Sequence, residues 1–88
     1  MKIREIEWDG ASVSHIAKHG VEPKEIEEAC FEGNPHILKS RQDSYFALGQ
    51  TKSGRYLAIV FKYLGQNKAK IVTARAMSGS ERRLYQRR

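Results

Sequence analysis

From His36 onward, hydrophobic and polar residues alternate with a period of two through most of the chain. Four segments there have the pattern of β-strands: 37–42, 45–51, 56–63 and 68–76. The connections between them are short, so consecutive strands must run antiparallel. The third segment is apolar on both faces, which indicates a central, covered strand. We therefore predict an antiparallel meander of about four strands.

The first third of the chain has the pattern of a strand followed by a helix. Residues 2–8 alternate and indicate a short N-terminal strand. Asp9 is a good N-cap, and the apolar spacing after it predicts a helix that runs to about His19. Gly20 suits the left-handed position that ends a helix.

A second helix is predicted to begin at Pro23, whose fixed φ suits the first helical position, and to end at Gly33. Its apolar stripe contains Cys30, the only cysteine of the chain. An internal disulfide is therefore excluded, which fits a reducing compartment. On an apolar stripe, a packed thiol is favoured over a nucleophile.

A short basic helix is predicted at the C-terminus. Ser78 and Glu81 have the spacing of a capping box, which places a helix over residues 79–86. This helix carries several arginines and little apolar surface. The elements together predict an α+β fold, in which two N-terminal helices pack on an antiparallel sheet and the basic helix follows it.

Length and composition limit this architecture to one domain. A chain of 88 residues with 40% hydrophobic content suffices for one core, so we expect a single domain over residues 1–88. The longest apolar run, 56–61, is far shorter than the roughly 20 residues that span a bilayer. The N-terminus lacks the pattern of a secretory signal, so we expect a cytoplasmic protein without a membrane partner.

The net charge of +6 is distributed unevenly. Residues 1–36 carry four Lys/Arg and eight Asp/Glu, whereas residues 37–88 carry twelve and two. A basic surface attracts polyanions, and nucleic acid is the commonest of these in the cytoplasm. A basic surface that binds no ligand is the alternative.

Several basic residues of the second half are candidates for phosphate binding. Arg75 closes the last predicted strand, and an arginine-rich helix follows within a few residues. Guanidinium groups bind phosphate oxygens bidentately and stay charged, so this arrangement suits an RNA backbone. Alternatively, the helix arginines are solvated or pair with the acidic second helix. The candidate RNA contacts besides Arg75 are Arg83, Arg87, Lys70 and Tyr85.

The run HIAKHG places His15 and His19 four residues apart, where a helix would bring them to one face. No third ligand or metal-binding motif accompanies them, so we predict no metal site and no cofactor. His19 with Lys18 beside it suits acid–base chemistry next to a phosphate. The alternative for His19 is a helix C-terminal residue stabilised by the helix dipole.

Several short motifs follow one another along the chain: Trp8-Asp9, Lys18-His19-Gly20-Val21, Tyr45 to Gly49, Tyr56 to Phe61 and Thr73 to Tyr85. Their order and spacing resemble the BrnT toxin family over nearly the whole chain. The resemblance implies a ribonuclease toxin of a type II toxin–antitoxin pair with a RelE-like fold. It also implies a cognate antitoxin that neutralises the toxin by direct binding. The complex would repress its own operon through the DNA-binding part of the antitoxin, expected to be ribbon-helix-helix-like.

The resemblance also implies site residues and a metal-independent mechanism. Arg75, helped by Arg82 or Arg83, would hold the scissile phosphate as charge develops. His19 would transfer protons and Lys18 would assist electrostatically. Glu81 is a candidate base, but its place in the capping box ranks a structural role first.

The chain departs from the family pattern in its first predicted helix. Gly10-Ala11-Ser12 stands where the family often has a lysine, and His15 stands where it often has an asparagine. These departures favour the second hypothesis, a non-catalytic RNA- or protein-binding module of the same fold.

Overall fold

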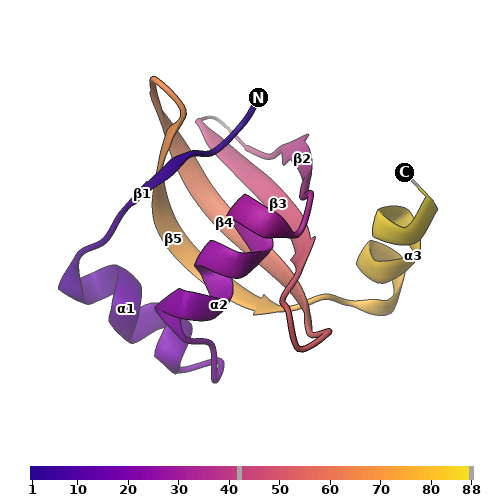
Figure 1. Ribbon diagram of the computed structural model, residues 1–88. Helices are drawn as coiled ribbons and strands as arrows, with labels where there is room; N and C mark the ends of the chain where they lie inside the picture. The colour runs from indigo at the N-terminus through magenta and orange to yellow at the C-terminus, as the bar shows by residue number, and fades with distance from the viewer. Residues whose placement is uncertain (42, 88) are drawn as a thin grey trace.

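The predicted meander forms most of a five-stranded sheet with the order β1-β5-β4-β3-β2 (Figure 1). The structure is a computed structural model and describes residues 1–41 and 43–87. Strands β2 to β5 pair antiparallel with their sequence neighbours, as predicted. Gln42, which the prediction included in the second strand, lies outside the described residues. The strands are β1 (Glu5–Glu7), β2 (His36–Lys39), β3 (Ser44–Gln50), β4 (Tyr56–Gly65) and β5 (Lys68–Ala76).

The N-terminal strand, whose partner the sequence left open, does not continue the antiparallel pattern of the meander. β1 is shorter than the predicted strand and pairs in parallel with β5, with Glu5 opposite Lys68 and Glu7 opposite Lys70. A parallel pair requires a long crossover, and here the intervening helices and the other strands provide it. The sheet is therefore mixed.

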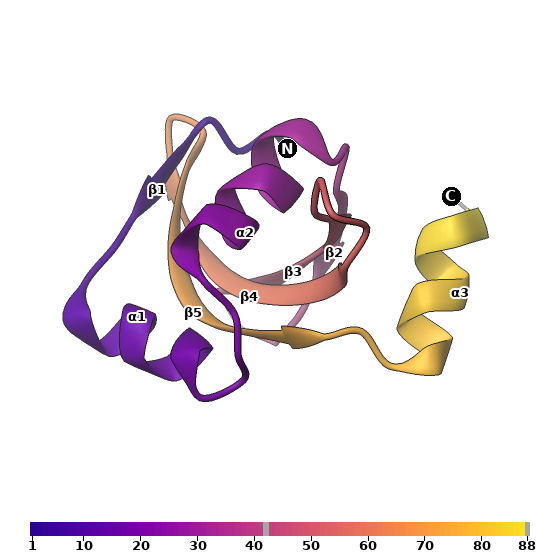
Figure 2. The same cartoon turned by 60° about the horizontal axis from the view of Figure 1, so that its bottom comes forward.

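The sheet curves around the helix that follows Pro23. β4 and β5 are joined by a two-residue turn in which Gln66 and Asn67 both have positive φ, 53° and 62°, as in a type I′ hairpin. A bulge interrupts their register between Val60 and Phe61. Bulges increase local twist and bend, and Figure 2 shows the strands wrapped around α2 (Pro23–Glu27).

The helices are α1 (Gly10–Ala17), α2 (Pro23–Glu27) and α3 (Gly79–Arg87), and a π-helical turn, η1 (Glu28–Glu32), continues α2. Asp9 caps α1 as predicted, because its Oδ1 accepts from the Ser12 backbone N–H at 2.7 Å. α1 ends two residues before His19, the predicted last residue. Pro23 opens α2 as predicted.

Two clusters of buried side chains lie on opposite faces of the sheet. Leu57, Ile59 and Phe61 face the main core, which α1, α2 and η1 complete. Ala58 points to the other face, where it meets Leu48 and Tyr85 under α3. Among the described residues, no helix is long and apolar enough to cross a membrane. The main-core members are Ile3, Ile16, Val21, Ile26, Ala29, Cys30, Ala47, Leu57, Ile59, Phe61, Ala69, Ile71 and Ala74.

α1 lies along the edge of β5 beyond the point where β1 ends (Figure 1). The Ser12 hydroxyl donates to the Ile71 carbonyl oxygen at 2.7 Å, and His15 Nδ1 donates to the Val72 carbonyl oxygen at 3.2 Å. These contacts satisfy strand carbonyls that have no neighbouring strand. The two positions where the chain departs from the family pattern thus include side chains that anchor α1 to the sheet.

Candidate functional site

Arg75, at the end of β5, is paired with α3. Its Nη1 and Nη2 donate to Glu81 Oε1 and Oε2 at 2.7 and 2.8 Å. These hydrogen bonds, followed by those from Ser78, lower the pKa of Glu81 to about 2, and the pair raises the pKa of Arg75. The Arg75 side chain remains 40% exposed. The guanidinium is therefore held in one orientation with part of its surface open to solvent.

The predicted capping box of α3 is confirmed. The Ser78 backbone N–H donates to Glu81 Oε1 at 2.8 Å, and the Glu81 N–H donates to the Ser78 hydroxyl at 3.2 Å. One carboxylate thus caps the helix and orients Arg75. A carboxylate with a pKa of about 2 and two strong partners is a weak proton acceptor at neutral pH.

Arg82 lies over the ring of Tyr56, with its guanidinium carbon 4.1 Å from the ring centroid. Gln86 Nε2 donates to the Tyr56 hydroxyl at 3.4 Å, and this bond together with Arg82 lowers the pKa of Tyr56. The Tyr56 backbone also links the start of β4 to the end of β5, because its carbonyl oxygen accepts from the Met77 N–H at 3.1 Å. Tyr56 was not among the predicted site residues, although its position at the start of the central strand was a usable signal.

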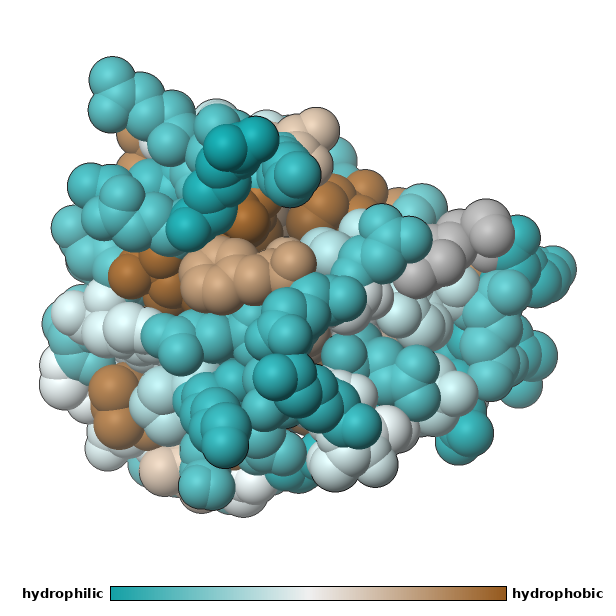
Figure 3. Space-filling model, viewed as in Figure 1, coloured by the Kyte–Doolittle hydropathy of each residue, from teal (hydrophilic) through white to brown (hydrophobic). Residues whose placement is uncertain are grey.

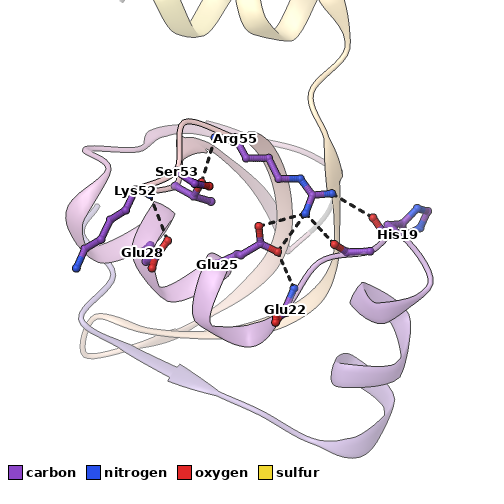
Figure 4. Close-up of polar contacts among 9 residues, drawn as sticks. His19, Glu22, Glu25, Glu28, Lys52, Ser53 and Arg55 are labelled. Carbon is purple, nitrogen blue, oxygen red and sulfur yellow. Dashed lines mark hydrogen bonds and ion pairs between the residues drawn. The ribbon is translucent and has the colours of Figure 1, made fainter.

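Lys18 and His19 lie in the turn that follows α1, and both are exposed. Gly20 has a φ of +69°, as its predicted left-handed position requires. Figure 4 shows the His19 side chain pointing away from the neighbouring polar network, while its carbonyl faces inward. The imidazole is accessible to a ligand.

Arg55, which was not among the predicted site residues, holds this turn in place. Its Nη1 donates to the Gly20 carbonyl oxygen at 2.7 Å and its Nη2 to the His19 carbonyl oxygen at 3.3 Å. The same guanidinium pairs with Glu25 at 3.1 Å (Figure 4). No motif contains Arg55, and only its position directly before the central strand sets it apart. It is a positioning residue for Lys18 and His19.

The two groups of candidate residues lie at the same end of the sheet. Arg55, which binds the Lys18–Gly20 turn, directly precedes Tyr56, whose ring lies under Arg82. α1 also follows the β5 edge toward Arg75, with Ser12 at Ile71 and His15 at Val72. Among the described residues, however, no hydrogen bond or ion pair joins Lys18 or His19 to Arg75.

The remaining predicted RNA contacts differ in accessibility. Arg83 and Arg87 are exposed on α3, and Lys70 lies 3.7 Å from an Asp9 carboxylate oxygen. Tyr85 is buried beneath α3, and its hydroxyl donates to the Gly33 carbonyl oxygen at 3.0 Å. This burial corrects the expectation for Tyr85, which anchors α3 and offers no stacking surface. The space-filling view shows a largely hydrophilic face, on which apolar side chains gather mainly in one band across the upper half (Figure 3).

Cys30 is buried, and burial raises the pKa of its thiol to about 12. The predicted core thiol is confirmed, because reactivity needs an accessible thiolate. Within residues 1–41 and 43–87, no three His, Cys, Asp or Glu side chains gather in a way that could hold a metal ion.

Comparisons with known proteins point to one family. A family model described as "Ribonuclease toxin, BrnT, of type II toxin-antitoxin system" matches residues 8–81. Among solved structures, the crystal structure of the Brucella abortus ribonuclease toxin, BrnT, matches with a TM-score of 0.65 and 24% identity. The match covers 89% of this chain and 97% of that one, and at this identity it shows the fold. No curated protein matches.

Proposed function

This chain belongs to the BrnT family of ribonuclease toxins of type II toxin-antitoxin systems, and from that premise we propose that it cleaves RNA without a metal ion. The family implies an antitoxin partner. In our proposal this antitoxin is a ribbon-helix-helix-like protein that neutralises the toxin by direct binding. It alone would contact operator DNA.

The observation that carries the proposal is the guanidinium of Arg75, which Glu81 holds in one orientation while part of its surface is exposed to solvent. Arg82 lies on the adjoining helix. In metal-independent RNA cleavage the 2′-hydroxyl attacks the neighbouring phosphorus as it loses its proton. The phosphate becomes pentavalent, and the 5′-oxygen leaves with a proton. Fixed donors aimed at the developing charge lower the barrier, by on the order of 3 kcal/mol each.

His19 is our candidate for the proton transfers, and Lys18 for electrostatic support. Both are exposed on a turn whose backbone Arg55 fixes at the Arg75 end of the sheet. In our proposal, an RNA strand that crosses this end of the sheet contacts both groups. Arg83, Arg87 and Lys70 are the proposed contacts to flanking phosphates. Glu81 acts in this scheme by orienting Arg75, and a role as a base is the alternative.

RNA cleavage by the purified protein in EDTA tests the proposal. His19→Ala should lower the cleavage rate by on the order of 100-fold without changing the melting temperature, because the side chain is exposed and supplies only chemistry. Lys24→Ala, which removes an exposed cation elsewhere, should cleave normally. Cleavage that EDTA abolishes and a divalent cation restores would contradict metal independence.

One observation favours the second candidate, a non-catalytic RNA-binding module. Arg75 Nη1 and Nη2 already donate hydrogen bonds to Glu81, so the charge of Arg75 is paired without a ligand. Salt-dependent RNA binding by wild-type protein that leaves the RNA intact, and strong expression without growth arrest, would establish this alternative.

A further inference from the structure

Two lysines lie directly opposite each other on neighbouring strands. Lys62 of β4 pairs in register with Lys70 of β5. Like charges in this position destabilise a sheet. Asp9 offsets only part of the charge, because its Oδ1 caps α1 and its Oδ2 lies 3.7 Å from the Lys70 ammonium. Lys62 is exposed, and no hydrogen bond or ion pair is seen for it among the described residues.

The two lysines line a pocket of about 230 Å³ between α1 and strands β4 and β5. The β5 bulge leaves Val72 without a partner on β4, and this residue lines the pocket beside Ile71. His15 forms part of the wall, where its bond to the Val72 carbonyl oxygen fixes the ring. If Nδ1 carries the hydrogen, Nε2 is left as an acceptor. The pocket thus combines two ammonium groups, the ring of His15 and apolar side chains.

The pocket and Arg75 lie on the same face of the sheet. Arg75 is opposite Ala58, and Lys70 is opposite Lys62. Ala58, Val60 and Lys62 alternate onto one face of β4, and Val60 and its partner Thr73 are only half-buried between the two cationic positions. Figure 1 shows α3 and the edge strand β1 on opposite sides of the sheet. An open strip therefore connects the two positions.

We propose that the Lys62–Lys70 pocket is a second phosphate-binding subsite for the RNA strand that reaches Arg75. The inference rests on the proposed function, because RNA is the ligand. Arg75 and Lys70 are five residues apart, roughly 16 Å along the strand, so a single phosphate cannot contact both. Two separated cationic positions joined by an open strip suit a linear polyanion better than a free phosphate ion.

Binding of a single-stranded 2′-O-methyl RNA tests this subsite without requiring cleavage. Lys62→Gln/Lys70→Gln should weaken binding about tenfold at low salt and reduce the log–log salt slope by roughly 0.7 for each phosphate that the variant no longer neutralises. Lys62→Arg/Lys70→Arg should bind like wild type, because the charge remains. Lys52→Gln is the matched control, since it removes an exposed, ion-paired lysine from the β3–β4 turn.

The possible results separate the subsite from the proposed function. Wild-type affinity and slope in the double glutamine variant would overturn the subsite, and so would an equally weakened Lys52→Gln. Impaired antitoxin binding with unchanged RNA binding would also overturn it, by assigning the pocket to a protein. A wild-type protein that binds the modified RNA through the pocket but cleaves no unmodified RNA supports the subsite and rejects the ribonuclease.

Discussion

Arg75 and Glu81 form a two-fold hydrogen-bonded ion pair across the junction of β5 and α3, and the same carboxylate caps α3. One side chain therefore couples the conformation of the last helix to the orientation of the proposed phosphate-binding arginine. Separating the charge of Glu81 from its capping function tests this coupling.

Glu81→Gln should keep the helix cap, because the amide oxygen can still accept from the Ser78 N–H. Glu81→Ala removes the cap and the ion pair and should lower the free energy of unfolding by about 1–2 kcal/mol, measured by urea denaturation. Glu27→Gln is an exposed control on α2. RNA cleavage that survives in Glu81→Gln excludes Glu81 as the base and supports a positioning role, whereas cleavage lost with RNA binding unchanged would favour the base.

The stability of the protein should fall in acid partly through Glu81. Its folded pKa of about 2 lies below the ordinary value of 4.5, so the pair stabilises the fold above pH 4.5 and is lost as the pH falls toward 2. The side chains are partly exposed, which limits the effect to about 1 kcal/mol. Unfolding at pH 5 and pH 3 should show a smaller drop in Glu81→Gln than in wild type. The pKa of Asp9 is also lowered, mainly by the backbone N–H of Ser12, so Glu81→Gln should retain some acid sensitivity.

Arg55→Lys should release the Lys18–Gly20 turn. A lysine cannot hold two carbonyls and a carboxylate in one fork, so we expect a destabilisation of about 1–2 kcal/mol and faster amide exchange in this turn. Lys52→Gln breaks an ion pair whose side chains are 66% and 55% exposed, and should cost less than about 0.5 kcal/mol. If both substitutions lowered the free energy of unfolding equally, Arg55 would not hold the turn as proposed.

Gly33 and Gly10 should respond oppositely to alanine. A Cβ at Gly33 would lie 2.5 Å from the Gln50 carbonyl oxygen and 2.9 Å from that of Ala29, so η1 would have to move from β3. We expect Gly33→Ala to destabilise by about 1–3 kcal/mol. At Gly10 no atom lies within 4 Å, and Gly10→Ala should be neutral or stabilise by up to about 1 kcal/mol. Thermal melting of both variants measures the difference.

The features predicted from the sequence are those that neighbouring residues determine. The meander follows from short connections, the start of α2 from Pro23, and the α3 cap from Ser78 and Glu81. The BrnT resemblance is confirmed by the family match. The RelE-like class itself, and the catalytic roles of Lys18, His19 and Arg75, stay predictions.

The features that escaped prediction depend on contacts between distant parts of the chain. The parallel partner of β1 is the last strand, which no local pattern specifies. Arg55 reaches a turn 35 residues earlier through backbone carbonyls, whose positions depend on the fold. Tyr85 is buried against Leu48 and Ala58, and its hydroxyl donates to the Gly33 carbonyl oxygen across 52 residues. Its local sequence contains no sign of these contacts.

The pairing of β1 with β5 has a consequence for the order of folding. It joins residues 5–7 to residues 68–70, whereas the hairpins of the meander close over short loops. Loop-closure entropy favours the hairpins as the nucleus, with the N-terminal strand docking late. During synthesis the Lys18–Gly20 turn emerges before Arg55, so the hydrogen bonds from Arg55 to its carbonyl oxygens form only later. The growing chain would thus fix the Lys18–Gly20 turn only after the segment that contains Arg55 and the central strands has been synthesised.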